Sequence, residues 1–346
     1  MTRNGTATPV RLTNVILSES GESRDVPKGT TCKTPATGMS EIIHIGNQTA
    51  LSAASLMLPF EYAIANGFDA FEWFPDGNAS GRGWDDSQIH QEMRSRIRTS
   101  AFASRVRLSV HAPWRANPLK PESLETLVRH LEFARDLGAV LVNIHLYPEA
   151  GLDAYVKAIE PLLRRLPEFG LRLSIENSPL TEPRLFNELF RRLTDLRPSG
   201  FEHVGMCLDL GHANLCEPTR NDYLQYIDLL DPEVRIIHIH LHENWGDFDT
   251  HLPIFTGPSA TDGAGVEGFV ERILKRNFSG SIILEQWPQP PALLNQARER
   301  LRGMLRQHLE DIRRPSPPRV QTELPSSHPP ALDTPPAGTR PLARRQ

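Results

Sequence analysis

Short apolar runs alternate with longer helical segments between residues 40 and 313, and this alternation limits the fold more than any other feature. The runs are rich in β-branched or aromatic residues, and each is short enough for a strand buried on both faces. They cover residues 41–46, 68–74, 106–111, 139–145, 171–176, 203–209, 234–241 and 281–285. Helical periodicity is clear over 121–138 and 152–166, where Pro121 opens the first segment and Gly138 follows its last turn. Eight such units predict an α/β fold, a (β/α)8 TIM barrel.

A doubly wound open sheet is the alternative fold, but it more often has a glycine-rich loop after its first strand, and none stands there. The two ends of the chain differ from the middle. Residues 1–39 show no sustained periodicity, and residues 314–346 hold nine of the 30 prolines. Such segments cannot bury enough apolar surface to offset chain entropy. We therefore predict one barrel domain over 40–313, between a disordered N-terminal segment and a proline-rich disordered tail.

The composition limits the partners and the cellular compartment that we expect for the protein. The net charge of −4 gives no sign of the excess positive charge that is typical of nucleic-acid-binding proteins. The cysteines Cys32, Cys207 and Cys216 are odd in number and form no CxxC pair, which argues against a disulfide framework and favours a reducing compartment. Residues 1–20 contain no secretory apolar region, and no run approaches the roughly 18 apolar residues of a membrane helix. We expect a cytoplasmic protein with no membrane partner, and a homo-oligomer is compatible with the sequence.

Residues that can bind metal close seven of the eight predicted strands. They are Glu72, His111, His145, Glu176, Asp209, His240 and Glu285. Active sites of (β/α)8 barrels lie at the C-terminal strand ends, so these side chains are expected to converge on one mouth. Buried carboxylates are unfavourable unless they are paired or bound to a cation. The set therefore predicts a divalent metal site, although each histidine alone would more often be a hydrogen-bonded packing residue. His212 follows Asp209 after three residues, and Gly211 is expected to let the backbone turn sharply between them.

The stretch HIHLHENWGDFDTH (238–251) holds four of the 13 histidines. His238, His240 and His242 alternate along one strand face, about 6.6 Å apart, so we expect only one to lie at the depth of a metal. We favour His240, with His238 deeper in the core, and keep His242 as the alternative. Asp249 and His251 follow in a loop that can fold back over the mouth.

Six motifs make residues 40–310 resemble the xylose isomerase-like TIM barrel superfamily (AP endonuclease family 2). They are HAPW (111–114), IENS (175–178), DLGHAN (209–214), HLHEN (240–244), DTHLP (249–253) and ILE (283–285). The superfamily includes sugar and sugar-phosphate isomerases and epimerases, together with endonuclease IV-like enzymes. For the isomerase branch the resemblance implies one metal, with Glu176 and Glu285 also serving as the acid–base pair. The implied ligands of that metal are Glu176, Asp209, His240 and Glu285.

For the endonuclease IV branch the resemblance implies two further metals, one held by His111, His145 and Glu176, the other by His212, Asp249 and His251. Three clustered cations suit phosphodiester cleavage. The chain departs from that branch, since Leu210 and Gly211 stand where small or thiol residues are expected, and no arginine separates Asp249 from His251. No basic loop interleaved with aromatic residues suggests wrapping of duplex DNA.

We predict a metal-dependent sugar or sugar-phosphate isomerase or epimerase of carbohydrate metabolism, acting by proton transfer through an ene-diolate. Zinc, manganese or cobalt fit the mixed ligands, with one to three ions per chain. Trp114 and Trp73 are candidates for stacking on a sugar face, with core packing as the alternative for each. One rival is a trinuclear zinc phosphodiesterase acting on abasic DNA, for which nucleic acid is the partner. Another is a non-catalytic, metal-stabilised binding protein that presents its tails to partners.

Overall fold

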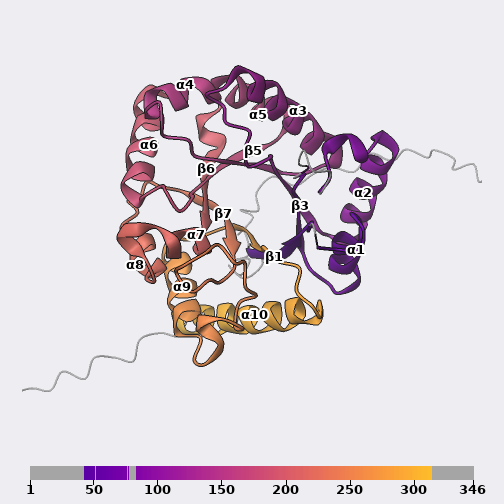
Figure 1. The fold of residues 1–346 in the computed structure, drawn as a ribbon, viewed down its shortest axis with the longest axis vertical. Coiled ribbons are helices and arrows are strands. Elements are labelled where there is room, and N and C mark those ends of the chain that lie inside the picture. The colour runs from indigo at the N-terminus through magenta and orange to yellow at the C-terminus, as the bar shows by residue number, and fades with distance from the viewer. Residues whose placement is uncertain (1–42, 51, 76, 78–82, 314–346) are drawn as a thin grey trace, which may run out of the picture. The chain divides into compact units, whose positions relative to one another are not determined.

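Eight parallel strands close into a barrel in the computed structural model, which describes residues 43–50, 52–75, 77 and 83–313 (Figure 1). Each strand pairs with the next along the chain, and β1 pairs with β8 to complete the ring. The strands are β1 (Ile43–Gln48), β2 (Ala70–Trp73), β3 (Arg107–His111), β4 (Leu141–His145), β5 (Arg172–Glu176), β6 (Val204–Asp209), β7 (Ile236–Leu241) and β8 (Gly280–Leu284). The predicted (β/α)8 barrel is confirmed. Both segments predicted to be disordered tails, 1–39 and 314–346, lie outside the described residues, so the domain boundaries stay predictions.

Helices form the layer around the strands (Figure 1). They are α1 (Leu58–Ala65), α2 (Gln91–Ser104), α3 (Pro121–Leu137), α4 (Leu152–Leu163), α5 (Leu166–Phe169), α6 (Pro183–Leu196), α7 (Leu210–Leu215), α8 (Tyr223–Asp228), α9 (Ala264–Lys275) and α10 (Ala292–Arg313). Gly138 ends α3 with φ of 72°, the left-handed conformation that favours glycine. The single helix expected over 152–166 is wrong at its end. Since Pro167 has no N–H to donate to the carbonyl of Leu163, α4 ends at Leu163 and α5 makes a separate turn.

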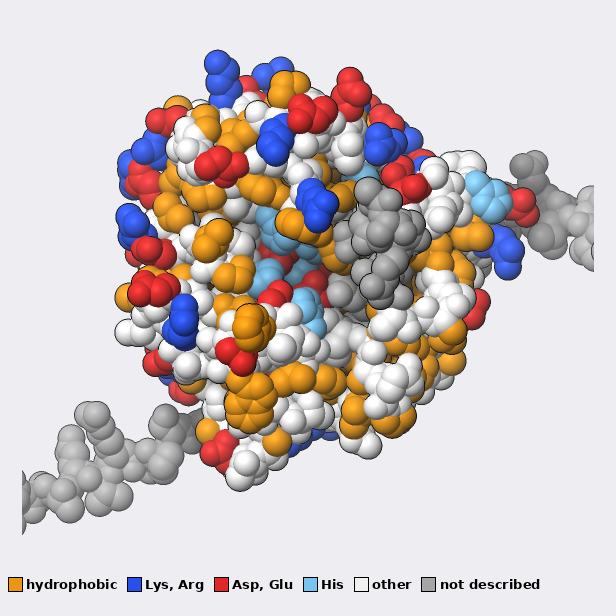
Figure 2. Space-filling model, viewed as in Figure 1, with side chains coloured by type: hydrophobic (Ala, Val, Ile, Leu, Met, Phe, Trp, Pro, Cys, Tyr) orange, Lys and Arg blue, Asp and Glu red, His pale blue; other side chains and the backbone are white. Residues whose placement is uncertain are grey.

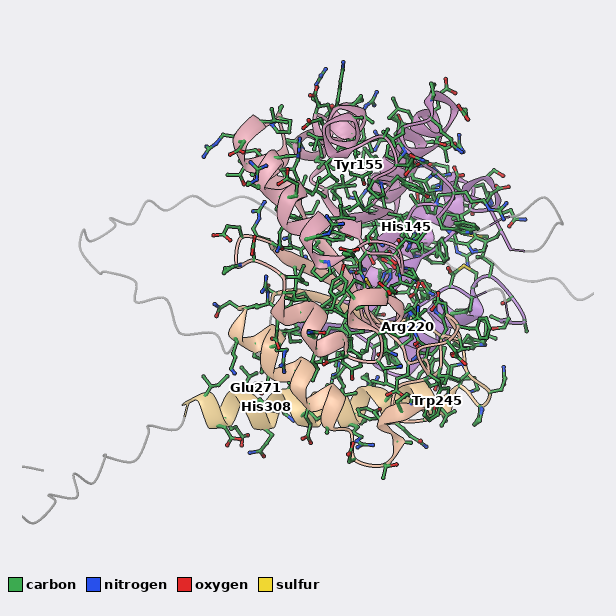
Figure 3. The ribbon with its side chains drawn as sticks, turned by 60° about the vertical axis from the view of Figure 1, so that its left-hand side comes forward. His145, Tyr155, Arg220, Trp245, Glu271 and His308 are labelled. Atoms are coloured by element: carbon green, nitrogen blue, oxygen red, sulfur yellow. The ribbon has the colours of Figure 1, made fainter. Side chains whose placement is uncertain are left out.

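Apolar side chains fill the layer between strands and helices. Tyr155, Ile159 and Leu163 repeat every four residues on α4 and are fully buried, which is the pattern of an amphipathic helix facing a core. The Tyr155 hydroxyl also donates to the carbonyl of His145, 2.9 Å away, and so ties α4 to the end of β4 (Figure 3). Elsewhere in the layer α9 packs along α10, where Glu271 on one helix interacts with His308 on the other (Figure 3).

Polar side chains bond to one another across the inside of the barrel. Glu72 on β2 accepts hydrogen bonds from Ser109 on β3 at 2.8 Å, and from His238 and His240 on β7 at 2.8 and 2.7 Å. Because β2 and β7 are not neighbours in the closed sheet, the histidine bonds cross the interior. Burial alone would raise the pKa of Glu72, but the two histidines hold it well below its ordinary value. Glu72 is therefore a buried anion, and His238 lies in the core as predicted.

Among the described residues, Cys207 and Cys216 are free and buried, and Cys32 lies outside this part of the chain. None of the described helices has both the length and the apolar composition needed to cross a lipid bilayer.

Candidate metal centre

Side chains from six successive strands meet at the C-terminal mouth of the barrel. Four of them end their strands, His240 is the penultimate residue of β7, and Glu285 directly follows β8. The strands pair in register there, with His145 opposite Glu176 and Asp209 opposite His240. All six are buried except His145, which is partly exposed. The strand-end residues are His111, His145, Glu176, Asp209, His240 and Glu285.

The Nδ1 atom of His240 faces three carboxylates. It lies 3.5 Å from Oε2 of Glu176, 3.5 Å from Oε2 of Glu285 and 3.8 Å from Oδ2 of Asp209. The other ring nitrogen is bonded to Glu72, which leaves Nδ1 free. Within the described chain, neither His240 Nδ1 nor Glu285 Oε2 has a hydrogen-bond partner. These four residues form the central group, whose nitrogen and oxygen donors fit a divalent cation such as zinc, manganese or cobalt.

A second group, the inner group, consists of His111, His145 and Glu176. The Nε2 atoms of the two histidines lie 3.0 and 3.3 Å from the two carboxylate oxygens of Glu176. Both Nδ1 atoms face backbone carbonyls, of Ala112 at 2.6 Å and of Trp114 at 3.4 Å. A carbonyl only accepts, so the hydrogen of each neutral ring belongs on Nδ1 and Nε2 is bare. A bare nitrogen beside a carboxylate is unfavourable unless the ring is protonated or a cation binds both atoms.

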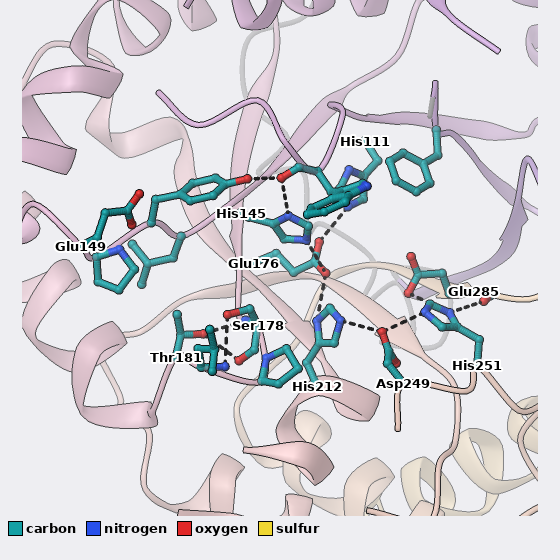
Figure 4. A pocket seen from close by; sticks show the side chains of 17 residues that line it. His111, His145, Glu149, Glu176, Ser178, Thr181, His212, Asp249, His251 and Glu285 are labelled. Carbon is teal, nitrogen blue, oxygen red and sulfur yellow. Dashed lines mark hydrogen bonds and ion pairs between the residues drawn. The ribbon is translucent and has the colours of Figure 1, made fainter. Parts of the chain in front are cut away.

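The third group, the loop group, repeats this pattern with His212, Asp249 and His251 (Figure 4). Both Nε2 atoms lie 3.2 Å from the same oxygen, Oδ2 of Asp249. The Nδ1 atoms face the carbonyls of Asn177 and Glu285, at 2.8 and 2.9 Å. Burial opposes a charged imidazole, yet Asp249 and Glu285 raise the pKa of His251 to about 10. Burial also opposes a charged ring at His212, but Asp209, Asp249 and Glu176 raise its pKa well above the ordinary value. Without a metal the protonated form of both rings is therefore favoured, and the Nε2 protons take the positions that a cation would occupy.

His242 lies inside the centre, so the expectation that only one histidine of the alternating set reaches this depth is wrong. Its Nε2 atom is 3.2 Å from both oxygens of Asp209 and 3.6 Å from Oε2 of Glu285. Its ring stacks on His251, with centroids 4.0 Å apart, and its Nδ1 atom has no hydrogen-bond partner among the described residues. His240 faces one more carboxylate than His242 and stays our predicted ligand, but both lie within the centre.

Gly211 makes room for His242. A Cβ atom at Gly211 would lie 1.9 Å from Cε1 of His242, which is far inside van der Waals contact. The sharp turn expected at this glycine is wrong, because α7 begins directly after β6. Asp209 caps this helix by accepting a hydrogen bond from the backbone N–H of His212 at 2.7 Å. The glycine is therefore required by packing rather than by backbone conformation.

Two asparagines that the sequence analysis did not single out hold the carboxylates in place. Asn143 donates to Oε2 of Glu176 and accepts from Ser174 at 2.6 Å. The side chain of Asn177 accepts a hydrogen bond from the backbone N–H of Asp209 at 2.8 Å and donates one to the backbone carbonyl of Asp209 at 2.9 Å. The signal for Asn143 in the sequence was a polar residue within an apolar run, VLVNIH, whereas Asn177 directly follows the strand-closing Glu176.

The two tryptophans proposed for sugar stacking differ. Trp73 is fully buried and packs against Phe60, Phe71 and Trp84, with ring centroids 5.0 to 5.9 Å apart, so it belongs to the core. Trp114 is 46% exposed and lines the cavity above the metal-binding groups. Figure 2 looks into this hollow, where histidine and acidic side chains show at the bottom.

A family model described as a xylose isomerase-like TIM barrel matches residues 60–307. Among curated proteins, the uncharacterized protein MJ1614 of Methanocaldococcus jannaschii is 30% identical over 145 residues, which cover 37% of this chain and 52% of that protein. The chain spans about half the length of the curated relatives it matches.

Solved structures resemble the chain at low identity. A D-tagatose 3-epimerase-like protein has a TM-score of 0.61 at 20% identity, over 78% of this chain and 99% of its own. Endonuclease IV from Thermus thermophilus has a TM-score of 0.53 at 21% identity, over 76% of this chain and 99% of its own. At such identities the likeness shows the shared fold.

Proposed function

The chain belongs to the xylose isomerase-like TIM barrel family, and from this premise we propose that it is a divalent-metal-dependent sugar or sugar-phosphate isomerase or epimerase. Enzymes of both branches, epimerases and endonuclease IV, are among its structural neighbours. A shared fold does not determine the reaction, which depends on the chain's own site residues.

One observation carries the proposal: two buried atoms, His240 Nδ1 and Glu285 Oε2, lie 3.5 Å apart without a hydrogen-bond partner among the described residues. Leaving a buried polar atom unpaired costs about 1–3 kcal/mol. Glu176 and Asp209 bring two further carboxylates to the same place, and buried like charges repel. A divalent cation held by these four residues removes both costs. When bound, such an ion polarises a substrate carbonyl and makes the neighbouring C–H more acidic.

Glu176 and Glu285 are the proposed acid–base pair. Burial opposes ionisation of Glu176, but His145, His240 and His111 hold its pKa well below the ordinary value. Glu176 is thus available as a carboxylate, and Glu285 keeps one oxygen free of protein hydrogen bonds. One carboxylate takes the proton from carbon, and the bonding electrons form the C=C bond of the ene-diolate. At the same time the carbonyl π electrons move onto the carbonyl oxygen. For epimerisation the other glutamate, protonated at the start, donates its proton to the opposite face of the same carbon and the carbonyl re-forms. For isomerisation the proton is added to the adjacent carbon, while the proton of the neighbouring hydroxyl passes to the former carbonyl oxygen.

Solvent exchange tests this reaction without knowledge of the natural substrate. Chain reconstituted with zinc, manganese or cobalt is incubated in D2O with a panel of aldoses, ketoses and their phosphates. We expect deuterium at the carbon next to the carbonyl of at least one compound, detected by NMR. The exchange should disappear in Glu285→Gln and persist in Glu271→Gln, which changes an exposed carboxylate on α9. A panel without any exchange would contradict the proposal.

The second candidate is an endonuclease IV-like trinuclear zinc phosphodiesterase. The inner group and the loop group favour it, because each turns the Nε2 atoms of two histidines toward one carboxylate. Incision of a duplex with a single abasic site by the zinc-loaded chain, together with no deuterium exchange in sugars, would favour this function over the isomerase.

A further inference from the structure

The cavity above the metal-binding groups is polar at its base and apolar along its walls. Its volume is about 670 Å³, within the range of about 300–1,000 Å³ that holds drug-sized ligands. The base consists of residues of the inner and loop groups together with Glu285 (Figure 4). The described wall residues are mostly aromatic, aliphatic or proline: Phe74, Trp114, Leu146, Tyr147, Pro148 and Leu180. A ligand that fills this space is polar at the metal end and apolar at the other.

The part of the wall that the structure describes offers no cation to a phosphate. Among the described residues that line the cavity, none is lysine or arginine, and the charged wall residue, Glu149, is acidic. Arg115 places its guanidinium over the ring of Trp114, 4.6 Å from the centroid, and is not one of the lining residues. A phosphate at the end of a substrate away from the metal would thus lose its hydration without gaining a charged partner.

Two large apolar side chains of the wall face solvent on backbone segments that hydrogen bonds hold in place. Leu180 is 87% exposed at the tip of a turn that Ser178 and Thr181 close with hydrogen bonds of 2.7 and 3.0 Å. Trp114 is 46% exposed, and its carbonyl accepts a hydrogen bond from the hydroxyl of Tyr147. Exposed apolar residues that continue a cavity mark a binding surface more often than scattered ones do.

We propose that the substrate of this centre is an unphosphorylated hydroxycarbonyl compound that carries an apolar, preferably aromatic, substituent at the end away from the metal. The inference rests on the proposed function and narrows its substrate class. The hydroxycarbonyl part reaches the central group, while the substituent packs against Trp114 and Leu180. The polar half of the substrate then contacts the polar base of the cavity, and the apolar half contacts its apolar wall.

Three metal-binding probes that differ in one substituent test this preference: acetohydroxamate, phenylacetohydroxamate and phosphonoacetohydroxamate. Their dissociation constants are measured by calorimetry on full-length chain with a known metal content. We expect the phenyl probe to bind at least about tenfold more tightly than the methyl probe, the gain that burial of a phenyl ring brings. The phosphonate probe should bind no more tightly than the methyl probe. Tightest binding of the phosphonate probe, or equal binding of all three, would overturn the inference.

Substitutions in the wall test whether the preference for the phenyl probe arises from Trp114 and Leu180. Leu180→Ser and Trp114→Ser should reduce the ratio of the phenyl-probe affinity to the methyl-probe affinity about threefold or more. Phe102→Ser is the matched control, because Phe102 is 88% exposed on α2 and does not line the cavity. A phenyl preference that both wall variants retain would also overturn the inference.

Failure of this inference and failure of the proposed function give different results. Probe binding needs no turnover, so a phenyl preference without deuterium exchange in any substrate would reject the reaction and keep the cavity's selectivity. Exchange in sugar phosphates combined with a phosphonate preference would keep the reaction and reject the substrate class. A chain that binds no metal would reject both.

Discussion

His240 and Glu285 face each other at the barrel mouth, with Nδ1 and Oε2 3.5 Å apart and no hydrogen bond to satisfy either atom within the described chain. The arrangement is fixed from behind, because Glu72 binds the other nitrogen of His240 at 2.7 Å. Metal-binding histidines are commonly oriented in this way by a carboxylate. The pair is thus prepared for a cation in the absence of one.

Glu285→Gln should abolish proton transfer while preserving the fold. The amide is close in size to the carboxyl group but cannot take a proton from carbon. We expect kcat to fall by about 10²–10⁴-fold, the contribution of a general acid–base group. The melting temperature of the metal-free variant should match that of the wild type. Near-normal turnover in Glu285→Gln would refute the assigned role, and Glu271→Gln provides the exposed control.

Glu72→Gln should weaken metal binding without touching the substrate. Loss of the carboxylate removes the group that orients His240, and substitutions of this kind typically cost about 10- to 100-fold in metal affinity. Titration with Co²⁺, followed by its visible absorption, gives both the affinity and the ligand geometry. If Glu72 only stabilised the core, the melting temperature would fall while the cobalt spectrum and affinity stayed at their wild-type values.

Metal should reverse the pH dependence of stability. The pKa of His251 is raised from 6.5 to about 10 in the metal-free fold, so its contribution is fully present below pH 6.5 and is lost as the pH rises toward 10. The melting temperature of the chelated chain should therefore fall from pH 7 to pH 10, and less steeply in Asp249→Asn. A cation requires neutral histidines, so stabilisation by metal should grow over the same range. Parallel pH profiles with and without metal would argue against shared ligands.

Gly211→Ala should destabilise the fold through His242. The added methyl group overlaps the imidazole, and overpacking of this kind typically costs about 1–3 kcal/mol in the free energy of unfolding. His242→Ala removes the obstacle, so the double variant should be more stable than the sum of the single effects predicts. Urea unfolding of the metal-free proteins measures this coupling. Effects that add within about 0.5 kcal/mol would mean that the two residues do not compete for space.

The strands and their closing residues could be predicted from the sequence because both obey simple rules. Parallel strands are buried on both faces, so they read as apolar runs, and their C-terminal ends must meet at one mouth. Glu176 and Asp209 each close such a run, and the structure brings them together. Contacts between distant elements could not be predicted in this way. The position of His242 depends on the missing side chain of Gly211, 31 residues earlier, which no periodicity reports.

Glu72 is a second residue whose contacts could not be predicted from the sequence. It stands near the end of β2, which suggested the mouth, yet it bonds His238 and His240 across the barrel. Which side chains meet there depends on how β2 and β7 face each other in the closed ring, and the sequence of either strand alone does not contain this information. The apolar wall formed by Trp114 and Leu180 depends in the same way on the folding of two separate loops.

Metal content per chain, measured by mass spectrometry on protein purified without chelator, tests the central claim most directly. The account predicts about one tightly bound divalent ion per chain, lost or weakened when His240 is replaced by alanine. About three zinc ions per chain would instead favour the phosphodiesterase. A chain that stays empty after zinc, manganese and cobalt have been supplied would contradict the metal centre and every function built on it.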